Sequence, residues 1–488
     1  MCYASNRLRH YVRHFGTNNI HGSVARNEKK RPFAELRGPS HIPYIGFIND
    51  ILNLGHPKDL HRTITKYHKQ FGQIFKIKIS TIDAVFISNP EMMRNVFAYE
   101  GKFPRHPLPN AWTYYNQKHN CKRGLFFMDG EEWLHYRQIL NNLILRDANW
   151  MAGPVEKICD RTINSMLDDV DFADGKHLIR IDNMEEKLYK WSIEVILSIM
   201  LGNSYSDETA KRIENLVKTF AGTVYNIFLY SSKLMTVPPK IADILQLPAW
   251  KRFEQVVPET LEIASTIINN ILDEAEHGDG LLVKLQKNIS SREVLIRIFA
   301  DLMIAAGDTT AFSTLWSTYL LAKNLEVQEQ VRSGIGEGEL ESSLIRGTVR
   351  EALRLYPVAP FIGRFLDSDA VIGGYCLPAN TLVLLSLHTA GRDADNFYSP
   401  LKFLPQRWVR DSNKGYPFSP CSVHASLPFA IGSRSCIGRK IALYQMHVLL
   451  TKILKSYRLL LKNETGVHSE LKMVTVPNTT IQLNFEKL

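Results

Sequence analysis

The residues that most strongly suggest chemistry form a short run around one cysteine near the C-terminus. Cys436 follows Phe429 and Arg434 in the sequence FAIGSRSCIG, and Gly432 and Gly438 stand on either side of it. A cysteine thiolate is a soft, strongly donating metal ligand, and nearby backbone N–H groups would tune it. The glycines would let the backbone approach a large planar ligand, Arg434 offers a forked cation for a carboxylate, and Phe429 could shield the sulfur from water. The rival interpretation is a glycine-rich turn before a helix, with an ordinary buried cysteine.

A second group of polar residues lies inside an apolar stretch that predicts a long helix, from Phe299 to about Leu325. Asp308 and Thr309 stand together there, and an acid beside an alcohol is costly in such a helix unless it has a task. Oxygen activation at a thiolate-ligated metal needs protons that neither the metal centre nor the substrate can supply. We therefore expect Asp308 to relay protons and Thr309 to hydrogen-bond the oxygen, in a helix distorted near Gly307. A core helix with an incidental polar patch is the alternative.

The run around Cys436 resembles the haem-ligand loop of the cytochrome P-450 family, and other motifs of that family follow in the same order and spacing. The resemblance covers essentially all of the chain beyond an N-terminal leader, and it implies haem b with Cys436 as the axial ligand of its iron. The family usually has glycine one position before Gly307, where this chain has Ala306, so the form of the helix distortion is left open. The resemblance also implies roles for residues that alone would suggest only helix packing or surface ion pairs: propionate binding by Trp133, Arg137, Arg364 and Arg434, and a buried ion network of Glu351, Arg354 and Arg407.

A further set of basic residues concerns the supply of electrons. The mitochondrial members of the family present basic residues at these places to an acidic [2Fe-2S] ferredoxin, which an NADPH-dependent reductase reduces. Electrostatic attraction of an acidic partner to the thiolate side of the haem is physically reasonable. For any one residue, ordinary solvated surface charge is the rival interpretation. The residues are Arg346, Arg350, Arg439 and Lys440.

The overall charge and the cysteines indicate where such a protein works. The formal net charge of +10 suits an acidic partner or an anionic membrane surface, and no zinc-finger, RNA-binding or Lys/Arg-dense pattern supports nucleic-acid binding. The six cysteines are scattered without a CxxC pair, which favours a reducing compartment over a disulfide framework. Residues 1–37 form a basic leader with no acid before Glu28, which is typical of a mitochondrial transit segment. We expect the protein on the matrix side of the inner mitochondrial membrane; a disordered basic tail is the alternative interpretation of the leader.

The pattern of apolar residues predicts one α+β domain, mostly helical, over residues 38–488, with small β-sheet regions near both ends. Apolar residues at three- and four-residue spacing dominate the middle of the chain, whereas short β-rich runs lie on both sides of it. The expected elements are a helix at 56–71, strands at 73–79 and 84–88, mostly helix from 130 to 350, short strands and turns from 358 to 408, a helix at 441–456 and a β-rich tail.

These features predict a haem-thiolate monooxygenase that uses O2 to hydroxylate a lipophilic substrate. The resemblance is greatest to insect mitochondrial enzymes of ecdysteroid synthesis, with hydroxylation at C-2 favoured, C-22 second and xenobiotic oxidation third. Apolar residues in 225–229 and 244–250 could make a peripheral membrane contact or only close the substrate pocket. Two other functional classes are the alternatives. A thiolate-haem isomerase or dehydratase would need neither the Asp308–Thr309 pair nor the basic residues, and a haem-binding sensor would need neither a proton relay nor a large apolar pocket.

Overall fold

The computed structural model describes residues 30–40, 52–79, 82–146, 149–168, 178–181, 183–235, 237–275, 278–410, 418–462 and 466–488. The predicted leader therefore lies outside the described residues, except for its last eight positions.

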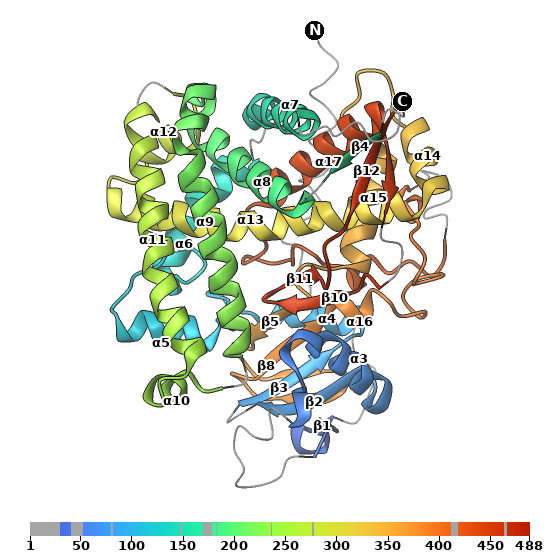
Figure 1. Ribbon diagram of the computed structural model, residues 1–488. Coiled ribbons are helices and arrows are strands. Elements are labelled where there is room, and N and C mark those ends of the chain that lie inside the picture. The colour runs from blue at the N-terminus through green and yellow to red at the C-terminus, as the bar shows by residue number, and fades with distance from the viewer. Residues whose placement is uncertain are drawn as a thin grey trace.

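Helices make up most of the described chain and surround one long central helix, α13 (Arg292–Lys323) (Figure 1). α8 (Met184–Leu201) packs along α13, while α9 (Asp207–Lys233) and α11 (Pro248–Ala275) pack against each other beside this pair. The other helices are α3 (Leu60–Phe71), α4 (Pro90–Val96), α5 (Asn110–Lys118), α6 (Gly130–Leu140), α7 (Ala152–Asp168), α10 (Pro239–Ile244), α12 (Leu281–Gln286), α14 (Leu325–Ser333), α15 (Ser343–Leu355), α16 (Leu387–Ala390) and α17 (Arg439–Ser456).

Small sheets join early and late parts of the chain. The largest has the order β2-β3-β8-β5, in which β3 and β8 are parallel and the other neighbours antiparallel. Its strands are β2 (Ile74–Ile79), β3 (Ile82–Ile87), β8 (Leu382–Ser386) and β5 (Phe361–Phe365). The smaller sheets are β1 (Arg31–Pro32) with β7 (Tyr375–Leu377) and β6 (Ala370–Ile372); β4 (Leu178–Ile181) with β12 (Leu483–Lys487) and β9 (Tyr457–Leu461); and β10 (Ser469–Lys472) with β11 (Val474–Pro477).

The predicted fold class, mostly helical with small sheets, is confirmed. Most expected elements lie within two or three residues of their predicted bounds, but α13 begins at Arg292, seven positions before the expected Phe299. The reason is local, because the Ser291 hydroxyl accepts a hydrogen bond from the Val294 N–H and caps the helix there. Within the described ranges, no helix is both long and apolar enough to cross a membrane.

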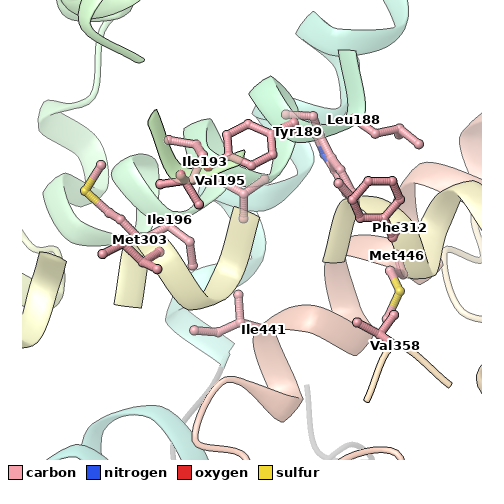
Figure 2. Packing of buried hydrophobic residues seen from close by; sticks show 14 of the residues in the cluster. Leu188, Tyr189, Ile193, Val195, Ile196, Met303, Phe312, Val358, Ile441 and Met446 are labelled. Carbon is pink, nitrogen blue, oxygen red and sulfur yellow. The ribbon is translucent and has the colours of Figure 1, made fainter. Parts of the chain in front are cut away.

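The contact between α8 and α13 forms the centre of the core. Figure 2 shows Tyr189 and Ile193 of α8 with Met303 and Phe312 of α13, all buried in one apolar cluster. The helices approach closely at Gly307, where an added Cβ would lie 2.7 Å from the Tyr189 ring. Since a methyl group there would push the helices apart, Gly307 permits the packing that fixes the central part of α13.

Candidate active site

The cysteine loop, residues 429–436, forms a tight turn immediately before α17. The Cys436 N–H donates to the Phe429 carbonyl over 2.9 Å, which closes the turn. Gly432 has a φ of 83°, and a Cβ there would lie 2.1 Å from a carboxylate oxygen of Glu100. Glycine at position 432 is therefore required by the backbone and by Glu100, whereas we had expected it to make room for a ligand.

Cys436 is exposed, although the protein around it is dense enough for burial to raise the pKa of its thiol. The N–H groups of Gly438 and Arg439 and the charges of Arg137 and Arg439 act in the opposite direction on that pKa. α17 begins at this point, so the positive end of its dipole adds to the same effect. A Cβ on Gly438 would make only an ordinary 4.0 Å contact with the sulfur. The thiol is thus accessible to a ligand and surrounded by the donors that a metal-bound thiolate needs.

α13 carries two exposed residues, Ala305 and Thr309, in the middle of a largely buried helix. They lie one turn apart on one face, and the Thr309 hydroxyl donates to the Ala305 carbonyl over 2.7 Å. α13 continues as an α-helix through this region, so it is not broken near Gly307, and a smaller distortion there stays a prediction. Gly307 itself faces the Tyr189 ring of α8 and serves helix packing.

Asp308 faces a different side of α13 from Thr309, because consecutive residues in a helix are about 100° apart. Burial, together with the charge of Glu185 on α8, raises the pKa of Asp308 to about 7. One turn after Glu185, the Tyr189 hydroxyl is buried without a hydrogen-bond partner among the described residues. Burial and the charge of Asp308 raise the pKa of Tyr189, so the two groups are close enough to interact. A carboxyl group with a pKa near neutral is suited to accept and release protons.

Three arginines gather near the cysteine loop, and each has a buried nitrogen without a partner among the described residues. These atoms are Nε of Arg137, Nη2 of Arg364 and Nε of Arg434. Burial lowers the pKa of Arg137 and of Arg434 to about 10. The Arg434 guanidinium lies 4.2 Å from the centre of the buried Trp133 ring. Cations with unused buried donors suit a ligand that carries carboxylates.

Two residues near these arginines were missed by the sequence analysis. The buried Glu100 accepts hydrogen bonds from Arg364 and from the Ser433 N–H, which lie 264 and 333 positions away in the chain. Burial and the charges of Arg434 and Arg364 lower the pKa of His106 to about 3, so His106 is neutral beside those cations. No local motif marks either residue, because their surroundings come from distant segments.

Glu351, Arg354 and Arg407 lie together and are fully buried. The distance from Arg354 Nη2 to Glu351 Oε1 is 2.7 Å, and that from Arg407 Nε to the same oxygen is 2.9 Å. Arg407 belongs to a 3-10 turn (Pro405–Trp408) that packs on α15. The network therefore ties α15 to the segment that leads toward the cysteine loop.

The four basic residues expected to bind a ferredoxin come from two helices that pack on each other, α15 and α17. Arg346 donates to the Glu341 carbonyl over 2.6 Å, and the Arg350 guanidinium lies 4.3 Å from the centre of the Trp408 ring. Arg346, Arg350 and Arg439 are exposed, while Lys440 is half-buried. The two pairs of basic residues, about 90 positions apart in the chain, thus lie on two helices that are in contact.

Comparison with known proteins identifies the family to which this chain belongs. A family model described as Cytochrome P450 matches residues 36–485. The chain belongs to the cytochrome P450 family. It is similar to Cytochrome P450 315a1, mitochondrial, of Drosophila melanogaster, with 42% identity over 467 residues that cover 93% of this chain and 88% of that protein. The mitochondrial 1,25-dihydroxyvitamin D(3) 24-hydroxylase of Rattus norvegicus is 27% identical over 93% of this chain and 89% of its own length. The mitochondrial cholesterol side-chain cleavage enzyme of Oncorhynchus mykiss is 28% identical over 88% of this chain and 86% of its own length.

This cytochrome P450 is a monooxygenase of the mitochondrial class, and its cofactor is haem b. The expected family, enzyme type and cofactor are thereby confirmed, and the isomerase, dehydratase and sensor alternatives are set aside. The residues present fit the cofactor. Haem carries an iron and two propionates, and the site offers an accessible thiol at Cys436 with unpaired nitrogens on Arg137, Arg364 and Arg434.

Proposed function

We propose that this cytochrome P450 hydroxylates a steroid, with an ecdysteroid and its C-2 position favoured, on the matrix side of the inner mitochondrial membrane. The observation that carries the proposal is the accessible Cys436 on the cysteine loop together with the exposed Thr309 hydroxyl on α13, because α13 packs against α17, which the loop precedes. Relatives named for cholesterol and for a vitamin D compound support a lipophilic, steroid-like substrate. The ecdysteroid and C-2 assignment goes further and rests on the resemblance described above.

In this proposal Cys436 would hold the haem iron through its sulfur, and bound haem would supply the chemistry that activates dioxygen. The half-buried Phe429 ring limits access of water to the sulfur. The unpaired nitrogens of Arg137, Arg364 and Arg434 would bind the propionates, and the Trp133 ring supports the Arg434 guanidinium that lies over it. Gly432 keeps the loop in the conformation that presents the sulfur, and Gly438 leaves open space beside it.

Proton delivery is the task of α13 in this proposal. The exposed Thr309 hydroxyl donates its one proton to the Ala305 carbonyl in this structure, and rotation of the O–H bond would redirect that proton to dioxygen. Asp308, whose pKa of about 7 permits both protonation states near neutrality, receives protons from the side of α8. Glu185 begins that route, because it stands in the first turn of α8 and is only half-buried.

Electrons come, in this proposal, from an acidic [2Fe-2S] ferredoxin with its NADPH-dependent reductase. Arg346, Arg350, Arg439 and Lys440 form the basic surface that attracts it. Such attraction acts mainly on the rate of association and weakens as salt screens it. The apparent KM for ferredoxin should therefore rise with ionic strength while substrate binding stays unchanged.

A peripheral membrane contact is proposed at α10 and the turn that follows it. Ile244 and Leu245 are 70% and 64% exposed, and Met235 and Ile241 add apolar surface nearby. Large apolar side chains gathered at this level of exposure suit a lipid surface. Ile244→Ser with Leu245→Ser should lower binding to cardiolipin-containing vesicles and leave the haem spectrum unchanged.

The carrying observation is tested with Cys436→Ser, using Cys376→Ser as the matched control at another exposed cysteine. The ferrous–CO absorbance band that requires a thiolate ligand should vanish in the first variant and persist in the second. A Cys436→Ser protein that keeps the band would refute the ligand assignment.

The substrate is tested with a panel of ecdysteroids, cholesterol and a lipophilic xenobiotic, by difference spectra and then by product analysis with ferredoxin, reductase and NADPH. Hydroxylation of an ecdysteroid at C-2 is the expected result. Hydroxylation at C-22, or turnover of the xenobiotic alone, would favour the alternatives named in the sequence analysis.

A further inference from the structure

Glu100 connects two parts of the site that the family motifs treat separately. Its Oε2 lies 2.8 Å from Nε of Arg364 on β5, and both side chains are almost fully buried. Its Oε1 accepts from the Ser433 N–H over 3.1 Å and lies 3.4 Å from the Ser433 hydroxyl. One carboxylate therefore holds both an arginine suited to a propionate and the backbone of the loop that carries Cys436.

The chain around Glu100 is shaped to allow this contact. Gly432, next to Ser433, has φ of 83°, and its hydrogen faces Glu100 at a distance where a Cβ would lie only 2.1 Å from Oε1. On the other side, the Asp367 N–H donates to the Tyr99 carbonyl over 2.9 Å, which fastens the residue before Glu100 to the chain just after β5. The backbone beside Glu100 is therefore fixed at Tyr99, and its carboxylate is fixed by the Ser433 N–H.

The contacts of Arg364 show what the carboxylate achieves. Glu100 occupies Nε, the Gly363 carbonyl accepts from Nη1 over 2.8 Å, and Nη2 is buried with no partner among the described residues. Two of the three guanidinium nitrogens are therefore held by protein, and the third is left for another acceptor. A guanidinium fixed in this way presents its remaining donor in one direction.

We infer that Glu100 is a positioning residue for haem: it orients Arg364 toward a propionate and, through the Ser433 N–H, fixes the loop that presents the thiolate. The inference rests on the proposed roles of Cys436 and Arg364 and adds that the propionate side and the thiolate side share one carboxylate. Removing it should loosen haem binding and disturb thiolate ligation together. A buried ion pair with only a structural role would lower stability without that combined effect.

The test compares Glu100→Gln with Asp301→Asn. Asp301 and Arg123 form another buried pair, with Oδ1 to Nη2 at 2.9 Å, and no contact of this pair with the cysteine loop is found among the described residues. The readouts are haem transfer to apomyoglobin, the fraction of the ferrous–CO spectrum at the thiolate position, and the reduction potential. Glu100→Gln should release haem about tenfold faster, equivalent to about 1.4 kcal/mol. Its ferrous–CO spectrum should lose the thiolate-type band on standing. Its reduction potential should rise, because a negative charge near the haem is lost. Asp301→Asn should lower stability and change haem release less than twofold.

Glu100→Asp keeps the charge but shortens the reach, so it provides a second variant if Glu100→Gln folds poorly. It should retain the reduction potential and still lose thiolate-type CO spectrum faster than the parent. If haem release and CO spectra of both Glu100 variants match those of Asp301→Asn, the inference is refuted. Loss of the thiolate band in Cys436→Ser would still uphold the proposed function in that case, so the two failures are distinguishable.

Discussion

Replacement of Glu351 by Gln should destabilise the protein more than any single surface change. Glu351 is fully buried and accepts five hydrogen bonds, from Arg354 Nε and Nη2, the Leu404 N–H, Arg407 Nε and Trp408 Nε1. Glutamine has nearly the same shape, but it leaves two buried guanidinium charges without a counter-charge. Breaking a buried ion pair by removing one partner typically costs about 3–5 kcal/mol.

The other contacts of the two arginines compensate for part of this cost. Arg354 also donates from Nη1 to the carbonyls of Gly391 and Pro400 and from Nη2 to the carbonyl of Lys402, so these two nitrogens keep acceptors when Glu351 is changed. Arg407 likewise keeps the Tyr398 carbonyl. The glutamine NH2 group, however, replaces one acceptor oxygen and would face the two or three N–H groups that now donate to it. Charge compensation and hydrogen bonds are therefore both lost, and we expect at least about 3 kcal/mol, roughly a hundredfold in the unfolding equilibrium.

The assay is urea denaturation followed by circular dichroism and by haem absorbance. Glu486→Gln is the control, because Glu486 and Arg458 form an exposed pair and such pairs contribute about 1 kcal/mol or less. The midpoint for Glu351→Gln should fall clearly below that of the control, and the yield of haem-replete protein should fall with it. A midpoint that matches the control would refute the argument that this network holds α15 to the segment before the cysteine loop.

Three further predictions concern α13 and the leader. Thr309→Ala should leave haem and substrate binding nearly intact, yet NADPH consumption should continue while product falls and hydrogen peroxide rises; unchanged coupling would remove Thr309 from proton delivery. Asp308 has a pKa raised from 3.8 to about 7, so the folded state binds the extra proton between about pH 4 and pH 7, and stability contributed by the protonated form is lost as pH rises through that window. Asp308→Asn should therefore gain stability relative to the parent between pH 5 and pH 8, measured from urea midpoints, and a constant difference would contradict the burial argument. Residues 1–40 fused to a fluorescent reporter should direct it to mitochondria, and a reporter found in the endoplasmic reticulum would overturn both the location and the proposed ferredoxin.

The local motifs were readable from the sequence because each acts over a few neighbouring residues. The spacing of Cys436, Gly432 and Gly438 indicated a thiolate loop before a helix, and the acid–alcohol pair in an apolar helix indicated proton chemistry. Glu351 and Arg354 stand one helical turn apart, so their pairing needed no knowledge of the rest of the fold. The helical fold class followed from periodicity in the same way.

Tertiary structure decided how these local pieces meet. Sequence could not show that α13 stays unbroken, since this depends on the fit of Gly307 against Tyr189 of another helix. Nor could the sequence show that Glu100 contacts both Arg364 and Ser433. The three residues come from distant segments, with Arg364 on β5 and Ser433 in the cysteine loop, and they meet only in the folded protein. Burial gave the same kind of result for Asp308, whose near-neutral pKa depends on desolvation by surrounding protein and on Glu185 of α8. Chain-local spacing specifies which groups are available, whereas long-range packing sets their partners, their solvent access and their charge.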